Sequence, residues 1–468
     1  MVSCFRYPYP LFRNSDSIEE NMRILIIQPG HYCSKTGTLL KSKHKKGLCP
    51  SFILPYLAAL FPRNAEITVI DETLQDIDFS AQYDLVGITV KTPQAQRAYE
   101  IGSIFREKGI SVVMGGYHVN LCPEEAENYS DSVIIGEAES VWNEFMGDFL
   151  AGSLKTRYTA NKRFDMRSMS FPRFDLMNFD LYKAFYGTKV PLETSRGCFN
   201  RCSYCCTPEV YKGGIVYRPV NEVIEDIKRV RSDFPYIKRP LFVFIDDNLT
   251  SDPQRCEELF TALKPLKVKW SGYFSAQICK RPDIIKLAAQ SGCYSAFLGL
   301  ESINSAALKA SNKEFNIKGE YAAYTKLFRD NNIILILGMM LGFPEDDIAI
   351  FDETVHFLNQ YGIPVAVIHP LYPFPKTEIY NRLKKEGMLY DETFWQRLHN
   401  PYALFKNNNL GNEKDSLESI YESTLSQVMS IRSIFKRTWP TRKYFLPLFA
   451  YNVALKIMLK KRGIWAFV

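Results

Sequence analysis

Short apolar runs alternate with amphipathic stretches over residues 22–150. Four of the five runs end in glycine, proline or an acidic residue, and helical spacing falls between the runs, as in FILPYLAALF and over residues 93–108 and 123–129. The five runs are RILIIQP (23–29), EITVIDE (66–72), DLVGITV (84–90), ISVVMGG (110–116) and SVIIGEAE (132–139). Strands that alternate with helices predict a doubly wound parallel sheet of α/β class, in which a ligand lies at the carboxyl ends of the strands.

A second alternation occupies residues 186–388, after a stretch without periodicity that we interpret as a linker (151–185). Its six strand-like runs are VPLETS (190–195), LFVFIDD (241–247), WSGYFSAQ (270–277), SAFLGLE (295–301), ILILGMML (334–341) and VAVIHPL (365–371). Six strand–helix units predict an open, partial (β/α)6 TIM-type barrel, whose chemistry belongs at the carboxyl ends of the strands. Residues 389–468 are predicted to be a helical, basic C-terminal region.

Composition is that of a globular protein, with 46% apolar and 23% charged residues. No apolar run is long enough to span a membrane, and the start of the chain lacks the apolar core of a secretory signal. Eleven cysteines are too few for a disulfide scaffold of 468 residues. We therefore expect a cytoplasmic protein. The formal charge of +7 arises at one end, since nine basic and no acidic residues follow Ser423.

Three cysteines lie in the loop after the first strand of the second alternation, with the spacing Cys198-x3-Cys202-x2-Cys205. Thiolates suit zinc or iron–sulfur clusters. Structural zinc needs four closed ligands, yet no second CxxC pair occurs and the side chain of Cys206 would diverge from that of its neighbour. A 4Fe–4S cluster held by three cysteines leaves one iron open to a small molecule. The pattern favours such a cluster over zinc or a chance group of thiols.

This spacing, with the aromatic Tyr204 before the last cysteine, resembles the signature of the radical S-adenosylmethionine (SAM) superfamily. The resemblance implies that the open iron binds SAM and that one electron, from a donor such as flavodoxin or ferredoxin, cleaves it to methionine and a 5′-deoxyadenosyl radical. Asp246-Asp247-Asn248 replaces the usual Gly-Gly-Glu-like contact, and Gly338-x-Met340-x-Gly342-x-x-Glu345 resembles the GxIxGxxE adenine-contacting pattern. The residues thus expected near SAM are Tyr204, Asp247, Ser275, Gln277, Glu301, Gly338, Met340 and Gly342. Each taken alone could equally be a turn residue or a satisfied buried acid.

The segment ISVVMGGYHVNLCPEEAENYSDSVIIGEAE resembles the cobalamin-binding domain found ahead of many radical SAM barrels. The resemblance implies a cobalamin cofactor. Its contacts would come from Thr89, Lys91, Gly115, Gly116, His118, Gly136 and Glu137. The Asp-x-His-x-x-Gly motif that supplies a cobalt ligand in some cobalamin proteins is absent, so we expect no histidine ligand from it. The alternative is a satisfied loop histidine at position 118 beside a plain tight turn.

Within the superfamily, the barrel and the basic region after it most resemble the hopanoid C-2 methylase group. FVFIDDNLTSDPQRCEELF and LGFPEDDIAIFDETVHFLNQYGIPVAVIHPLYPFPKTEIYNRLKKEG carry this similarity. It implies methyl transfer from methylcobalamin to an unactivated carbon of a lipid or natural-product substrate. Two alternatives stay open: a radical SAM cyclase, ring-contracting enzyme or epimerase without methyl transfer, and a non-catalytic metal-binding protein.

The basic end of the chain mixes Arg and Lys with Trp, Phe, Tyr and Leu. A basic helix with aromatic residues can lie on an anionic membrane, which would make the protein peripheral to it. A helix that packs its apolar face on the barrel and leaves its lysines in water is an equal alternative. Nucleic acid is a weaker hypothesis, because no RNA-binding domain is recognisable.

Overall fold

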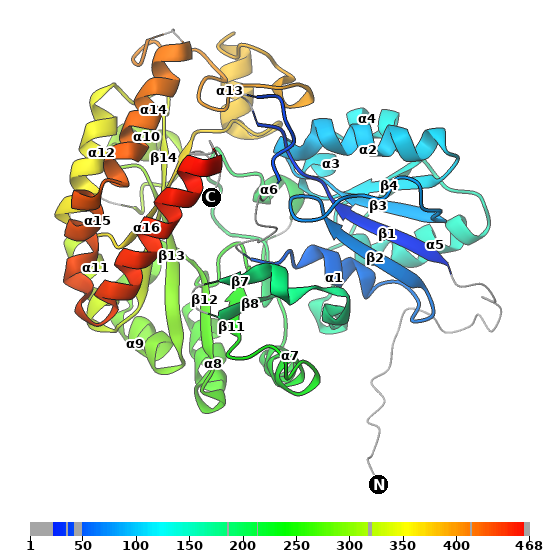
Figure 1. Cartoon of the computed structure of the whole chain (residues 1–468), viewed down its shortest axis with the longest axis horizontal. Helices are drawn as coiled ribbons and strands as arrows, with labels where there is room; N and C mark the ends of the chain where they lie inside the picture. Colours follow the sequence, from blue (N-terminus) through cyan, green and yellow to red (C-terminus); the bar gives the residue numbers. More distant parts are fainter. Residues whose placement is uncertain are drawn as a thin grey trace. The chain divides into compact units, whose positions relative to one another are not determined.

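The computed structural model describes residues 22–33, 36–41, 49–184, 187–212, 214–316, 321–411 and 414–462 (Figure 1). Its contacts divide them into two compact units. Unit 1 comprises residues 22–31, 39–41 and 51–181; unit 2 comprises the short segments 32–33, 36–38 and 49–50 and the chain from Tyr182 onward. Among the described residues, no helix has both the length and the apolar character needed to cross a membrane.

Unit 1 is a parallel sheet with the strand order β2-β1-β3-β4-β5-β6. Ile24–Ile27 in the first strand are buried, as a strand covered on both faces requires. The strands are β1 Arg23–Gln28, β2 Glu66–Asp71, β3 Leu85–Thr89, β4 Ser111–Gly115, β5 Ser132–Ile135 and β6 Arg157–Thr159. The helices are α1 Ile53–Ala58, α2 Ala95–Glu107, α3 Tyr117–Leu121, α4 Pro123–Ala126 and α5 Trp142–Leu150. The strand order changes direction between β1 and β3, so the predicted doubly wound sheet is confirmed.

The sixth strand of this sheet was not predicted. β6 lies within residues 151–185, the segment interpreted as a linker, and pairs in parallel with β5, placing Tyr158 opposite Ile134. The following turns bury Met166 and Phe174, and the chain stays with unit 1 as far as Leu181. The strand is only three residues long and has one buried side chain, so its sequence lacks the apolar run that marked the others.

Unit 2 contains a curved sheet with the order β15-β14-β13-β12-β11-β8-β7, parallel except for the short edge strand β7. Its strands are β7 Lys183–Ala184, β8 Gly187–Leu192, β11 Leu241–Phe244, β12 Lys269–Phe274, β13 Cys293–Glu301, β14 Ile334–Leu341 and β15 Val365–Pro370. The helices are α6 Thr207–Val210, α7 Val220–Asp233, α8 Pro253–Leu263, α9 Pro282–Gln290, α10 Ser305–Ala310, α11 Tyr321–Asp330, α12 Ala349–Gln360 and α13 Glu378–Lys385. The six parallel strands confirm the predicted partial barrel.

Helices at the end of the chain pack on the outside of this barrel. They are α14 Lys414–Val428, α15 Ile431–Thr438, the short 3-10 segment η10 Trp439–Tyr444 and α16 Phe445–Arg462. α14 and α15 both contact α12, and α16 contacts α15, as the orange and red ribbons show (Figure 1). The predicted helical C-terminal region is therefore part of unit 2.

Candidate functional site

The three cysteines lie in a loop whose two ends are held together by a small sheet. β9 (Ser195–Arg196) and β10 (Val216–Tyr217) pair antiparallel at its base. Gly197 follows with φ +98°, a conformation that side chains disfavour, and it turns the chain into Cys198. The loop thus leaves the carboxyl end of β8, where a barrel carries its chemistry.

Burial raises the pKa of all three thiols, and each senses the charge of another cysteine of the set. Such thiolates need a positive partner, which iron supplies. Among the described residues, three ligating side chains, those of His118, Cys122 and Glu125, have their ligand atoms within 4.8 Å of one another. The three cysteines do not form such a close group. Sulfurs around one zinc ion would be about 3.8 Å apart, given a Zn–S bond of about 2.3 Å. The three sulfurs are therefore not gathered as closely as the ligands of a single zinc ion would be.

Hydrogen-bond donors surround the sulfur atoms. Asn248 Nδ2 donates to Cys198 Sγ at 3.9 Å, and the backbone and side chain of Thr207 donate to Cys205. Tyr204 makes a hydrogen bond with Cys202. Such donors tune the potential of an iron–sulfur cluster. Asn248 was not predicted as a contact of the thiol loop, because it lies fifty residues from its sulfur partner.

Two aspartates at the end of β11 hold the loop. Asp246 is buried and accepts from the Thr194 backbone N–H at 2.7 Å and from the Ser195 hydroxyl at 2.7 Å. Asp247 accepts from the Gly197 N–H at 2.9 Å and from the Thr207 hydroxyl at 3.1 Å, so it ties the two ends of the cysteine segment. Its predicted contact with SAM stays a prediction, and the hydrogen bonds give this side chain a positioning role.

A charged cluster lies beside Tyr204 at the end of β13. Glu301 has φ +73° at a register shift of the sheet, and its carboxylate pairs with Lys313 Nζ at 2.5 Å. Lys313 Nζ also lies 5.8 Å from the centre of the Tyr204 ring and acts electrostatically on Cys202. A strained acidic residue at a barrel edge is a marker of function. Lys313 was not predicted, because it follows α10 in a loop without any motif.

The glycine-rich turn after β14 is closed by Asp346 rather than by Glu345. Asp346 Oδ2 accepts from the N–H groups of Gly342 and Phe343, both at 3.0 Å, and burial raises its pKa to about 6. Gly342 has φ +89°, and a Cβ there would lie 2.6 Å from the Tyr421 hydroxyl. Glu345 instead pairs with Arg382 at 3.1 Å. The turn is thus built by packing, and its predicted adenine contact stays a prediction.

The remaining predicted SAM positions differ in exposure. Gly338 is required by packing, since a Cβ would come within 2.6 Å of the Phe297 ring. Ser275 is buried and caps the short helix that begins at Ala276, whereas Gln277 on that helix is exposed and Met340 is half-buried. Ser275 and Gln277 follow β12 directly, whereas Gly338 and Met340 lie within β14 and not in the turn after it.

The strand ends of unit 1 present mainly backbone. Gly116 and Gly136 have positive φ, and a Cβ at Gly116 would come within 2.9 Å of the Val90 nitrogen and 3.1 Å of the Thr89 hydroxyl. At Gly115 an added Cβ would meet nothing closer than 3.7 Å. Lys91 is exposed after β3. The carboxyl edge of a parallel sheet is where a ligand such as a corrinoid binds in doubly wound folds.

His118 and Glu137 are engaged within unit 1. The His118 ring is fully buried, with Nε2 2.9 Å from the Tyr99 hydroxyl and Nδ1 3.3 Å from the Thr92 hydroxyl. Glu137 pairs with Arg163 at 2.8 Å. These contacts are those of the satisfied histidine considered as the alternative, so a bound corrinoid would receive no cobalt ligand from His118 as it lies here. The cobalamin contacts predicted for both residues stay predictions.

Comparison with known proteins places this architecture in a family. Residues 192–358 match the model of the radical SAM superfamily. The chain is 32% identical over 361 residues to a bacteriochlorophyllide d C-12(1)-methyltransferase of Chlorobaculum tepidum, covering 76% of this chain and 78% of the relative. It is 24% identical to a hopanoid C-2 methylase of Rhodopseudomonas palustris, over 80% of this chain and 72% of that one.

A solved structure shares the fold. The radical SAM methyltransferase TsrM of Kitasatospora setae, solved with cobalamin and a [4Fe–4S] cluster bound, superposes with a TM-score of 0.66 at 13% identity. The match covers 95% of this chain and 99% of that one, which establishes a shared fold. The predicted resemblance is thereby confirmed, and the relatives extend it beyond the hopanoid type. The chain belongs to the radical SAM superfamily, in the group that contains these methyltransferases.

Proposed function

We propose that this protein is a cobalamin-dependent radical SAM methyltransferase that methylates an unactivated carbon. The observation that carries the proposal is the thiol loop after β8, found in a chain that shares 32% identity with a bacteriochlorophyllide methyltransferase over three quarters of its length. The alternative of a non-catalytic metal protein has no such support.

In unit 2, different side chains would bind the cluster, position the loop and contact SAM. Cys198, Cys202 and Cys205 would hold a 4Fe–4S cluster, and the cluster would supply one-electron chemistry to bound SAM. Asp247 keeps the ends of the loop together. Lys313 and Glu301 place one positive and one negative group beside Tyr204, where they can orient the carboxylate and amino groups of SAM. A flavodoxin or ferredoxin would deliver the electron.

The glycine-lined edge of unit 1 is the proposed corrinoid site. A bound corrinoid would supply the methyl group. Gly116 lets the turn after β4 pack closely on Val90 and Thr89 at the end of β3, and Lys91 offers an exposed cation to the phosphate or amide groups of the corrinoid. The His118 ring is engaged by the hydroxyl groups of Tyr99 and Thr92, so it would not be available to a bound corrinoid in this arrangement.

The substrate class is an apolar molecule, and a tetrapyrrole carboxylate is the first one to test. Two Chlorobaculum tepidum relatives, at 32% and 28% identity, are methyltransferases of bacteriochlorophyllide d. The hopanoid C-2 methylase at 24% identity makes a polycyclic lipid the second class.

Methyl-labelled SAM tests the proposal. Protein reconstituted anaerobically with iron, sulfide and cobalamin is mixed with labelled SAM, reductant and either a chlorin carboxylate or a hopanoid. We expect label in the product together with 5′-deoxyadenosine. Formation of 5′-deoxyadenosine without labelled product from either class would instead favour radical chemistry without methyl transfer, and the lack of a corrinoid absorption spectrum would remove the cobalamin part.

A further inference from the structure

The exposed face of α15 is apolar and basic, the reverse of an ordinary surface helix. Ile431, Phe435 and Trp439 follow one another at four-residue spacing and are 50%, 45% and 60% exposed. Arg432 and Lys436 lie exposed beside them. A soluble helix normally turns such apolar residues toward the core. The alternative in which an apolar face of the tail packs on the barrel therefore does not describe this face of α15. It does describe part of α16, where Leu448 is buried against Ile334 and Val365 of the barrel strands.

The inner face of α15 explains this orientation. Arg437 is fully buried and donates to the carbonyl oxygens of Ile363 at 3.0 Å and Val428 at 2.9 Å, and burial lowers its pKa to about 10. Ser433 donates to the Asn359 side chain at 2.8 Å. These polar contacts fix the rotation of the helix on α12 and force Phe435 and Trp439 outward.

The apolar surface continues beyond α15. Phe435 stacks on Trp439 with ring centres 5.3 Å apart, and Phe445 lies against both at 5.6 and 5.2 Å. Leu446, which directly follows Phe445 in α16, is 73% exposed. Between them η10 presents two exposed cations, Arg442 and Lys443.

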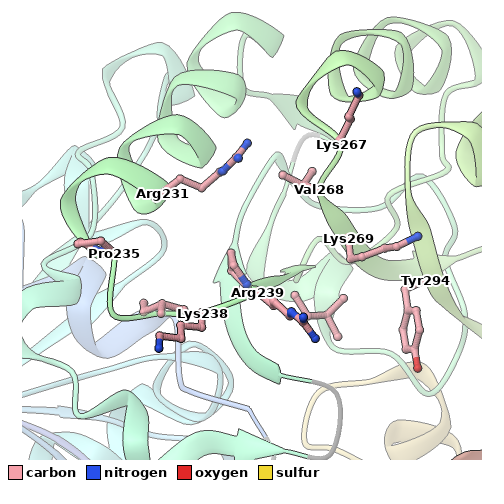
Figure 2. Close-up of a pocket in the computed structure, with 11 residues that line it drawn as sticks. Arg231, Pro235, Lys238, Arg239, Lys267, Val268, Lys269 and Tyr294 are labelled. Carbon is pink, nitrogen blue, oxygen red and sulfur yellow. The ribbon is translucent and has the colours of Figure 1, made fainter.

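A basic hollow of about 680 Å³ opens at the amino ends of β11 and β12 (Figure 2). Figure 2 shows cationic side chains from three segments around it, the end of α7, the loop before β11 and the start of β12. The five cations are Arg231, Lys238, Arg239, Lys267 and Lys269, and none of the eleven lining residues is acidic. All five are exposed. Such a concentration of one sign of charge attracts anions.

The hollow and the C-terminal face are continuous. Tyr294, which lines the hollow, lies 6.0 Å from the Tyr444 ring in η10. Lys443 Nζ lies 5.5 Å from the centre of that same ring. The cations of the hollow and the exposed residues from Phe435 to Leu446 are thus linked through the half-buried rings of Tyr294 and Tyr444 into one region of unit 2. We call it the basic–aromatic face.

We propose that the basic–aromatic face binds the surface of an anionic phospholipid bilayer. The exposed apolar residues would enter the headgroup region, Trp439 and Tyr444 would lie at its polar boundary, and the cations would meet lipid phosphates. The proposal does not depend on the proposed methyl transfer, since it concerns the amino ends of the strands and not the thiol loop.

Charge and exposure distinguish a bilayer from other occupants. A second copy of this chain would bring the same cations against one another, which repel. Nucleic acid would use the cations but not aliphatic side chains such as Ile431 and Leu446. An anionic bilayer uses both kinds of group at once.

Vesicle sedimentation of the full-length, cluster-loaded protein tests this proposal. The vesicles are pure phosphatidylcholine, or phosphatidylcholine with about 30% phosphatidylglycerol. We expect binding to the anionic vesicles, weakened at least tenfold by Lys267→Gln/Lys269→Gln, since each cation near an anionic surface contributes a factor of about five. Phe435→Ser/Trp439→Ser should weaken binding to a similar degree, and high salt should reverse only the charge-dependent part.

A matched control uses the same residue types elsewhere in unit 2. Ile348 is 51% exposed at the other end of the barrel strands, and Lys385 is exposed on α13. Ile348→Ser/Lys385→Gln should bind as the parent does. Iron content and circular dichroism establish that each variant is folded; if Phe435→Ser/Trp439→Ser does not fold, Arg442→Gln/Lys443→Gln replaces it. Equal vesicle binding by the parent and the variants would overturn the proposal. So would a parent that does not bind vesicles but forms a dimer that Phe435→Ser/Trp439→Ser abolishes. Release of the bound protein from anionic vesicles by transfer RNA, at a lower concentration than competing anionic lipid requires, would overturn it as well.

Discussion

In the sheet of unit 1, the charged side chains near the strand ends hold one another. Glu72 pairs with Arg97 at 2.6 Å, Glu137 pairs with Arg163, and His118 is bound by Tyr99. At the corresponding edge of the barrel in unit 2, three half-buried thiols have hydrogen-bond donors beside them, and desolvation still raises their pKa values. The two edges differ in what their polar groups still require. In unit 1 the named side chains satisfy one another and build the edge of the sheet. In unit 2 the thiols become thiolates only beside a positive partner, which a cofactor can supply.

The largest effect should follow the loss of one thiol. Cys202→Ser is expected to lower iron content and 5′-deoxyadenosine formation by more than about a hundredfold, because even the outer partners of a metal site are worth 10–100-fold. Cys206→Ser serves as the control, since its neighbour Cys205 already supplies the ligand at that point. Equal losses in the two variants would contradict the assignment of the three ligands.

Breaking the ion pair of unit 1 should affect stability and not the cluster. Arg97→Met leaves the buried carboxylate of Glu72 without its cation and should cost about 3 kcal/mol of unfolding free energy. Arg106→Met on the same helix breaks an exposed pair with Asp131 and should cost less than about 1 kcal/mol. Urea unfolding measures both. If Arg97→Met also lost iron, the ion pair between Arg97 and Glu72 would contribute to cluster binding as well as to the stability of unit 1.

At the barrel edge, Asp346 is buried and accepts hydrogen bonds from the turn after β14. The pKa of Asp346 is raised to about 6, so the folded protein binds its proton more tightly than the unfolded chain. Stability from this group is therefore highest below about pH 4 and falls as pH rises to about 6, by no more than about 3 kcal/mol. Asp346→Asn should remove this slope in urea unfolding between pH 4 and 7. An unchanged slope would mean that another group titrates there.

The smallest effect should come from the aspartate that positions the loop. Asp247→Asn keeps one acceptor for Gly197 or Thr207 and should lower cluster retention about tenfold, measured as the rate of iron loss to a chelator. Asp347→Asn, on an exposed carboxylate that caps Ala349, is the control and should retain its iron. If Asp247→Asn keeps its cluster but binds SAM more weakly, the role as a SAM contact would be favoured over positioning.

Much of the candidate site could be predicted because its signals are local. The spacing of Cys198, Cys202 and Cys205, and the apolar runs that became β1 to β5 and the barrel strands, are readable within a few residues. The assignments that stay predictions, such as those of Ser275 and Lys91, depend on where a ligand lies relative to a strand end. Sequence position alone carries no information about that.

The sequence by itself determined two sheets, their order along the chain and a thiol loop at the start of the barrel. The tertiary structure alone decided which polar residues satisfy one another: Asp247 meets Gly197 across fifty positions, Lys313 turns back on Glu301, and Arg437 rotates α15 so that Trp439 faces outward. The physical reason is that hydrophobic periodicity is set by neighbouring residues. Hydrogen bonds and ion pairs join groups that only the folded chain brings together.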